Sequence, residues 1–234
     1  MSLFGIDSVV RLYQTYTEDL RVAREAQREL LCRYPLKPKL DDVEAELTYL
    51  ALRAVRPTVV VEIGSYHGWS TTWILRALRD NGMGRLHTFD LADHATRAVP
   101  EELSDGRWIF EHGDVRDKLD RMPPKPGYLF IDAVHTAGFA RWYTRSLLPR
   151  LPEGTPVSVH DVYHGRRPWP VTEGSVLLAW LRDRGIEHFT PSRAGDPDTY
   201  DRLIGLKRKL RVMAPVRGSN DNPMVFFEAT NSAA

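Results

Sequence analysis

Five short apolar segments, each carrying an acidic residue or a histidine at its end, constrain the fold of this chain most strongly. They cover residues 58–64, 85–91, 108–114, 127–133 and 155–163, and helical patterns follow most of them. Strands that alternate with helices predict a mostly parallel α/β sheet covered on both faces. Two further strand candidates, residues 186–192 and 223–229, bring the predicted sheet to seven strands.

The segment before this pattern is predicted to be helical. Residues 8–33 place apolar side chains at helical spacing among charges, and Pro35 and Pro38 interrupt the pattern. Asp41 and Glu44 have the spacing of a capping box, which predicts a second helix that ends near Val55. We expect an N-terminal helical cap or dimerisation element at residues 1–56 and an α/β domain at residues 57–234. The N-terminal helices suggest a homo-oligomer, and nothing in them suggests chemistry.

Composition excludes several classes of protein. The formal net charge is +1, so no basic field points to nucleic acid. The single Cys32 excludes an internal disulfide and suits a cytoplasmic protein. No apolar stretch reaches the ~18 residues of a membrane span, and the first residues lack the pattern of a signal peptide. The polar and basic segment 194–222 contains a run of cations at residues 207–211, for which a solvated helix face is favoured over a phosphate-binding patch.

Two glycines follow the first predicted strand. Gly64 and Gly68 allow a tight turn and let a ligand approach the main-chain N–H groups at a helix start. A dinucleotide fingerprint requires a third glycine in a register that Ser65 and Tyr66 break. A pyrophosphate site is therefore disfavoured.

Acidic residues and histidines gather at one edge of the predicted sheet, because parallel strands bring their carboxyl ends together there. The strand ends carry Glu62, Asp90, Asp114, Asp132, and the pair His160-Asp161, with His135 and His164 just beyond. Any one acid could instead be a helix cap or a buried hydrogen-bonded group. The correlated set favours a ligand site.

The E-x-G-x-x-x-G pattern at Glu62 to Gly68 resembles the first motif of class I S-adenosylmethionine (SAM)-dependent methyltransferases. The resemblance implies a Rossmann-like methyltransferase fold. It also implies that the loop and its acid contact the methionine part of SAM, that Asp90 accepts from both ribose hydroxyls, and that Asp114 and Val115 contact the adenine. The cofactor-binding residues expected on this basis are Glu62, Gly64, Ser65, Tyr66, Gly68, Ser70, Asp90, Asp114, Val115 and Asp132.

The segments EIGSYHGWS, FIDAVHTAGFARWY and SVHDV are similar to one subgroup of that superfamily, the metal-assisted sugar and macrolide O-methyltransferases and the proteins related to cephalosporin hydroxylases. This resemblance implies that Asp132, His160 and Asp161 bind a divalent metal ion and that His135 is the general base. His160 replaces the acid usual in the subgroup. The replacement leaves three alternatives open: magnesium, a transition metal such as manganese, iron or zinc, or no metal.

The predicted function is SAM-dependent methyl transfer to a hydroxyl of a small molecule, such as a sugar, a catechol-like compound or another natural product of antibiotic biosynthesis. The loop after the fifth strand, with Arg166, Arg167 and Trp169, is expected to cover this acceptor. Two alternatives remain. The chain could be a SAM-fold enzyme that performs N- or C-methylation, cyclisation or hydroxylation, or it could be a non-catalytic SAM-fold partner in a complex.

Overall fold

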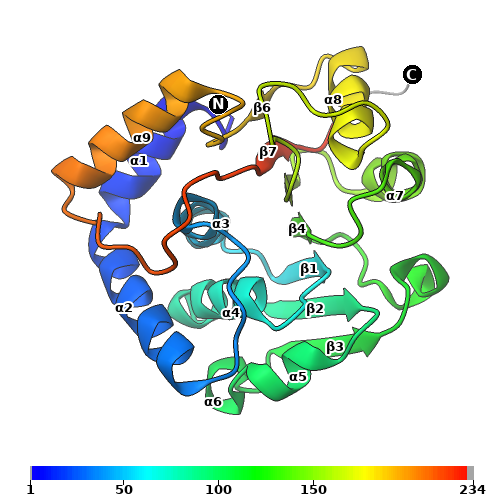
Figure 1. Ribbon diagram of the computed structural model, residues 1–234. Coiled ribbons are helices and arrows are strands. Elements are labelled where there is room, and N and C mark those ends of the chain that lie inside the picture. Colours follow the sequence, from blue (N-terminus) through cyan, green and yellow to red (C-terminus); the bar gives the residue numbers. More distant parts are fainter. Residues whose placement is uncertain (1, 231–234) are drawn as a thin grey trace.

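The computed structural model describes residues 2–230. Within these residues, seven strands form one sheet in the order β3-β2-β1-β4-β5-β7-β6. Their bounds are Val59–Ile63 (β1), Arg85–Asp90 (β2), Trp108–His112 (β3), Tyr128–Ile131 (β4), Pro156–Val159 (β5), His188–Phe189 (β6) and Val225–Glu228 (β7). Only β7 runs antiparallel to its neighbours, β5 and β6. The predicted mostly parallel seven-stranded sheet is confirmed, and Figure 1 shows β1, β2 and β3 pointing the same way.

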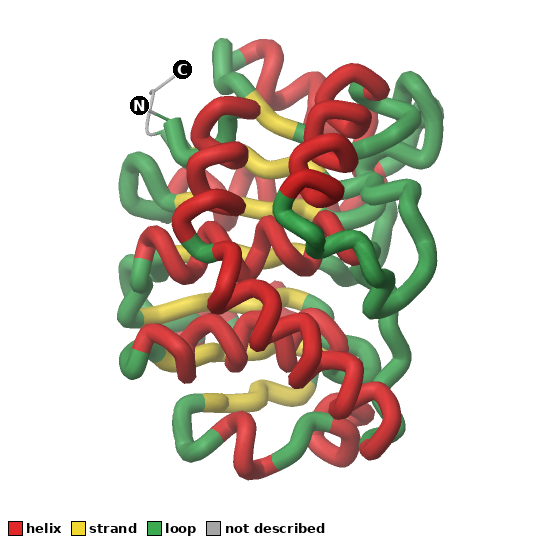
Figure 2. Tube along the Cα trace, turned by 90° about the vertical axis from the view of Figure 1, so that its left-hand side faces the viewer, coloured by secondary structure: helices red, strands yellow, loops and turns green. Residues whose placement is uncertain are grey.

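Helices cover both faces of the sheet, as predicted. They are α1 (Ile6–Thr15), α2 (Thr17–Arg33), α3 (Asp42–Val55), α4 (Trp69–Asn81), α5 (His94–Ala98), α6 (Glu101–Ser104), α7 (Ala137–Trp142), α8 (Glu173–Asp183) and α9 (Pro197–Lys209). Figure 2 shows the strands stacked as one sheet behind helices that face the viewer.

Strand alternation divides the core into two clusters. Val60 and Phe130 pack with α1 to α4 on one face, whereas Val61 and Ile131 pack with α7 and α8 on the other. Because both faces are covered, the central strands are apolar almost throughout. The chain builds β2 and β3 on one side of β1 and then crosses to β4 on its other side. This switch point is where an open parallel sheet offers a crevice at its carboxyl edge.

Several helix predictions need correction. The predicted helix over residues 8–33 is divided at Tyr16 into α1 and α2. The helix expected after β3 is two 3₁₀ turns, and the one after β4 continues from α7 into a π turn and a 3₁₀ turn that contains Pro149. Pro149 lacks the N–H that an α-helix interior needs. The capping box of Asp41 and Glu44 at the start of α3 is confirmed.

Residues 197–209 of the basic segment form α9, which lies beside α1 (Figure 1). The prediction of a solvated face is wrong for Lys207, because this side chain is buried and its Nζ lies 2.8 Å from Oε1 of Glu46. Packing against the N-terminal helices turns Lys207 inward, while Arg208 and Lys209 remain exposed. No helix among residues 2–230 is long and apolar enough to cross a membrane. The boundary at residue 56 and assembly through the N-terminal helices stay predictions.

Candidate active site

The loop between β1 and α4 has a shape that only glycine permits at its ends. Gly64 and Gly68 both have positive φ angles, +84° and +82°. A Cβ atom at Gly64 would lie 1.9 Å from the backbone oxygen of Asp132, so the loop touches the end of β4 directly. Asp90, at the end of β2, fastens the loop by accepting hydrogen bonds from the N–H groups of Ser65 (2.6 Å) and Tyr66 (2.8 Å).

A cavity of about 290 Å³ opens beside this loop at the carboxyl edge of the sheet. Among the residues predicted to bind the cofactor, six line it: Gly64, Tyr66, Asp90, Asp114, Val115 and Asp132. Phe89, Leu91, Val134 and Phe139 add apolar surface that the sequence analysis did not assign. The cavity therefore joins the ends of β1, β2, β3 and β4, as the resemblance implied.

Glu62 and Ser70 lie behind the wall of this cavity rather than in its lining. Glu62 is fully buried and accepts hydrogen bonds from the hydroxyls of Ser70 (2.6 Å), Thr71 (2.8 Å) and Thr88 (2.7 Å). Alternation along β1 directs its side chain toward α4, because it shares the face of Val60. Burial raises the pKa of Glu62 to about 7, although the three hydroxyls oppose this rise. Ser65 and Gly68 also do not line the cavity, and they shape the loop.

Asp114 lies at the far end of the cavity beside Arg116. The guanidinium donates to both carboxylate oxygens, with Nη2 2.5 Å from Oδ2 and Nε 3.0 Å from Oδ1. These hydrogen bonds from Arg116 lower the pKa of Asp114, so the carboxylate stays ionised and can only accept.

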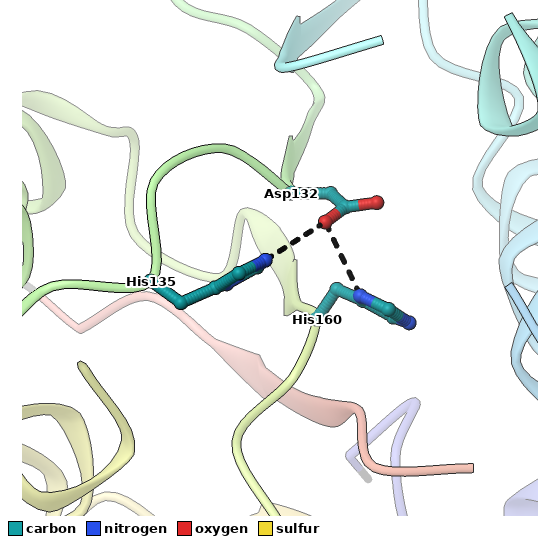
Figure 3. Close-up of side chains that lie close together, drawn as sticks. All are labelled: Asp132, His135 and His160. Atoms are coloured by element: carbon teal, nitrogen blue, oxygen red, sulfur yellow. Dashed lines mark ion pairs between the residues drawn. The ribbon is translucent and has the colours of Figure 1, made fainter. Parts of the chain in front are cut away.

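The ends of β4 and β5 bring Asp132, His135 and His160 together (Figure 3), and Asp161 lies beside the two histidines. Asp132 Oδ1 lies 3.2 Å from His160 Nδ1 and 3.6 Å from His135 Nε2. Asp161 reaches the same two nitrogens, at 3.3 Å from His160 Nδ1 and 3.2 Å from His135 Nε2. The four residues predicted for catalysis and metal binding thus form one cluster.

Each histidine of the cluster also contacts a buried glutamate from outside the strand ends. His160 Nε2 lies 3.3 Å from Glu44 Oε2, and His135 Nδ1 lies 2.9 Å from Glu173 Oε2. Burial disfavours charge on both rings, but the surrounding carboxylates outweigh it and raise the pKa of each histidine. Two residues of functional interest were therefore missed by sequence analysis. Glu44 was recognised only as a cap, and Glu173 lies in no motif.

A second cavity of about 310 Å³ lies beside His135. His135, Asp161, His164, Trp169 and Glu173 contribute to its lining, together with Val162, Pro168 and Thr172. The side chain of Trp169, in the loop after β5, is 74% exposed and gives this lining an aromatic surface in contact with solvent. Arg166 and Arg167 are exposed and do not line it, and the expectation that their loop covers an acceptor stays a prediction. Asp132 of the first lining and His135 of the second lie next to each other, with 3.6 Å between Oδ1 and Nε2.

Residues 61–162 match the family model described as Methyltransferase domain. The match begins within β1 and ends just after β5, so it contains every predicted site residue. The predicted Rossmann-like fold of class I SAM-dependent methyltransferases is confirmed by this match and by the strand order. No sequence among curated proteins matches the chain.

Solved structures share the fold at low sequence identity. A putative O-methyltransferase from Klebsiella pneumoniae is 17% identical, with 89% of this chain and 90% of that chain covered and a TM-score of 0.57. A putative caffeoyl-CoA O-methyltransferase from Staphylococcus aureus is 14% identical, with coverages of 96% and 98% and a TM-score of 0.56. An O-methyltransferase from Bacillus cereus in complex with SAH is 16% identical, with coverages of 97% and 100% and a TM-score of 0.51.

Proposed function

We propose that this protein transfers the methyl group of SAM to a hydroxyl of a small molecule. The observation that carries the proposal is the contact between the linings of two cavities, where His135 Nε2 lies 3.6 Å from Asp132 Oδ1. Asp132 lines the cavity next to the glycine loop, and His135 lines the cavity beneath Trp169. Such an arrangement suits a cofactor on one side and an acceptor on the other. The matched O-methyltransferase structures support a hydroxyl acceptor.

The first cavity would hold the cofactor. Asp90 and Asp114 offer carboxylate oxygens, which accept hydrogen bonds from ribose hydroxyls and from an exocyclic amine. Phe89, Val115 and Phe139 offer apolar surface for the adenine and for the carbon skeleton. The loop at Gly64 would lie along the methionine part, because its backbone closely approaches the end of β4.

The reaction is a direct displacement at the methyl carbon, so the acceptor oxygen must line up with carbon and sulfur. In this proposal the acceptor lies in the second cavity, and Nε2 of His135 takes the proton of its hydroxyl. Nδ1 of His135 contacts Glu173, which leaves Nε2 as the nitrogen that faces Asp132 and the first cavity. Asp161, 3.2 Å from Nε2, stabilises the ring when it carries the proton.

The residues present also fit a divalent ion. Both nitrogens of the buried His160 lack a hydrogen bond of acceptable geometry, although carboxylates surround the ring. Asp132, His135 and His160 offer ligand atoms within 4.8 Å of one another. Because His135 is assigned to proton transfer, we propose Asp132, His160 and Asp161 as the ligands, with Asp161 Oδ1 3.3 Å from His160 Nδ1. This mixed oxygen and nitrogen set favours a transition metal over magnesium. When bound, the ion would lower the pKa of the acceptor hydroxyl.

Isothermal titration with SAH, followed by transfer of labelled methyl from SAM to a panel of sugars, catechols and other hydroxylated compounds, tests the proposal. We expect micromolar SAH binding and methylation of at least one hydroxyl compound. Asp90→Asn is the matched variant, because it removes the charge that fastens the loop, and Asp93→Asn is its surface control. A chain that binds no SAH, or that labels only amines or carbon atoms, would contradict the proposal.

A further inference from the structure

We propose that Glu173 is a positioning residue that fixes the orientation and tautomer of His135, so that Nε2 of this ring faces Asp132 in the lining of the first cavity. The inference rests on the proposed function for its catalytic meaning. Its structural content, the state of the His135 ring, can be measured independently of any reaction.

The contact between Glu173 and His135 is short, and an ionised Glu173 can only be the acceptor in it. Oε2 of Glu173 lies 2.9 Å from Nδ1 of His135. A carboxylate can only accept, so in the neutral ring Nδ1 carries the proton and Nε2 keeps its lone pair. That lone pair is what a proton acceptor needs.

The His135 ring requires such a partner, because its side chain is 36% exposed and other carboxylates compete for it. Asp161 lies 3.2 Å and Asp132 3.6 Å from Nε2, and the ring of His160 lies 6.2 Å away. Asp132 or Asp161 alone would favour a proton on Nε2. Glu173, on the opposite side of the ring, is the nearest of the three carboxylates at 2.9 Å and the most deeply buried, and it therefore favours Nδ1–H.

The start of α8 holds Glu173 rigidly. Thr172 and Ser175 form a capping box around it. A Cβ atom at Gly174 would lie 2.6 Å from the backbone oxygen of Val162, so the helix start presses against the segment after β5. Thr172 also forms a β-bridge with Thr136, the residue that follows His135. Glu173 and His135 are therefore fixed relative to one another by backbone contacts.

Glu173 is a poor choice for stability alone. Its side chain is 2% exposed, and burial raises the pKa of Glu173, although His135 and the neighbouring Tyr143 hydroxyl oppose the rise. A buried carboxylate costs free energy that a neutral side chain of similar size would avoid. A requirement at His135 accounts for a carboxylate at this position.

The test uses the full chain labelled with ¹⁵N-histidine and saturated with SAH, in alkaline buffer where the ring is neutral. Two-bond ¹H–¹⁵N spectra, with His135→Gln to assign the signal, report the tautomer. We expect Nδ1–H in the wild type and in Glu173→Gln, whose amide oxygen still accepts, and a shift toward Nε2–H in Glu173→Ala. Asn81→Ala, which removes hydrogen bonds to Leu52 and Arg53 at the end of α4, should lower Tm and leave the tautomer unchanged.

Turnover with catechol as the probe acceptor gives the second readout. Glu173→Ala should lower kcat about 10²-fold, which is the usual contribution of a general base to the rate, with little change in KM for SAM. Glu173→Gln should recover most of this loss in kcat. An Nε2–H tautomer in the wild type, an unchanged spectrum in Glu173→Ala, or a loss confined to KM would overturn the inference. A wild type that binds SAH but methylates no hydroxyl compound would refute the proposed function, while the spectrum would still decide the role of Glu173.

Discussion

Oε2 of Glu44 in α3 lies 3.3 Å from Nε2 of His160 at the end of β5. This contact connects an N-terminal helix to the end of a central strand. His160 follows Ser158 on the face of β5 that looks toward α3, because side chains alternate along a strand. The helices before residue 56 thus supply a carboxylate to the candidate active site. The expectation that they carry no chemistry needs this correction.

Removing the Glu44 carboxylate should destabilise the fold. Its oxygens accept hydrogen bonds from the N–H groups of Asp41 and Met224, both at 2.8 Å, in addition to contacting His160. We expect Glu44→Ala to lower the free energy of unfolding by about 3 kcal/mol, the usual cost of breaking a buried charged pair. Urea denaturation measures this change, with the exposed Glu187→Ala as control. Equal stabilities of the two variants would show that the contacts of Glu44 contribute little.

Gly64→Ala should abolish SAH binding. Its Cβ would overlap the backbone oxygen of Asp132 at 1.9 Å, so the loop and the end of β4 must separate. Gly82→Ala is the matched control, because Gly82 has a similar positive φ of +68° but no atom within 4 Å of the added Cβ. We expect the control to lose about 1 kcal/mol of stability and to keep its SAH affinity. Calorimetric titration of both variants distinguishes steric overlap from backbone strain.

Glu62→Gln distinguishes a structural role of this acid from cofactor contact. Because Glu62 lies behind the cavity wall, we expect the variant to bind SAH within about threefold of wild type, well below the effect of losing a charged hydrogen bond. A much larger loss of SAH affinity would instead support the predicted contact between Glu62 and SAM.

The stability of the Glu62 variant should also depend on pH. The pKa of Glu62 is raised from 4.5 to about 7, so its contribution to stability is present below 4.5 and is lost as pH rises through 7. Glu62→Gln should therefore gain stability relative to wild type as the pH is raised across this interval. Thermal unfolding over the same range provides the measurement.

The rate of methyl transfer should rise with pH along an acid limb governed by His135. Burial lowers the pKa of this ring, but Glu173, Asp132 and Asp161 outweigh burial and raise it above 6.5. A base acts only in its neutral form, so we expect the midpoint of the limb above 6.5. Glu173→Gln should move the midpoint to lower pH, because one stabilising charge is lost. Profiles of kcat against pH measure both effects. If the midpoint does not shift in Glu173→Gln, the acid limb does not report the ionisation of His135.

The sequence by itself determined the order of strands and helices, the glycine loop and the gathering of acids at one sheet edge. These features depend on local periodicity, on backbone conformations that only glycine adopts readily, and on the rule that parallel strands end together. Asp90, Asp114 and Asp132 were therefore found from their positions at strand ends, and all three line one cavity.

Only the tertiary structure decided which side chains meet. Glu62 turns toward α4, because it is the penultimate residue of β1 and alternation directs it away from the crevice. Glu44 and Glu173 reach His160 and His135 because α3 and α8 pack against the ends of β4 and β5. Such contacts join residues far apart in the chain, and no local pattern encodes them, because they depend on how helices dock onto the sheet.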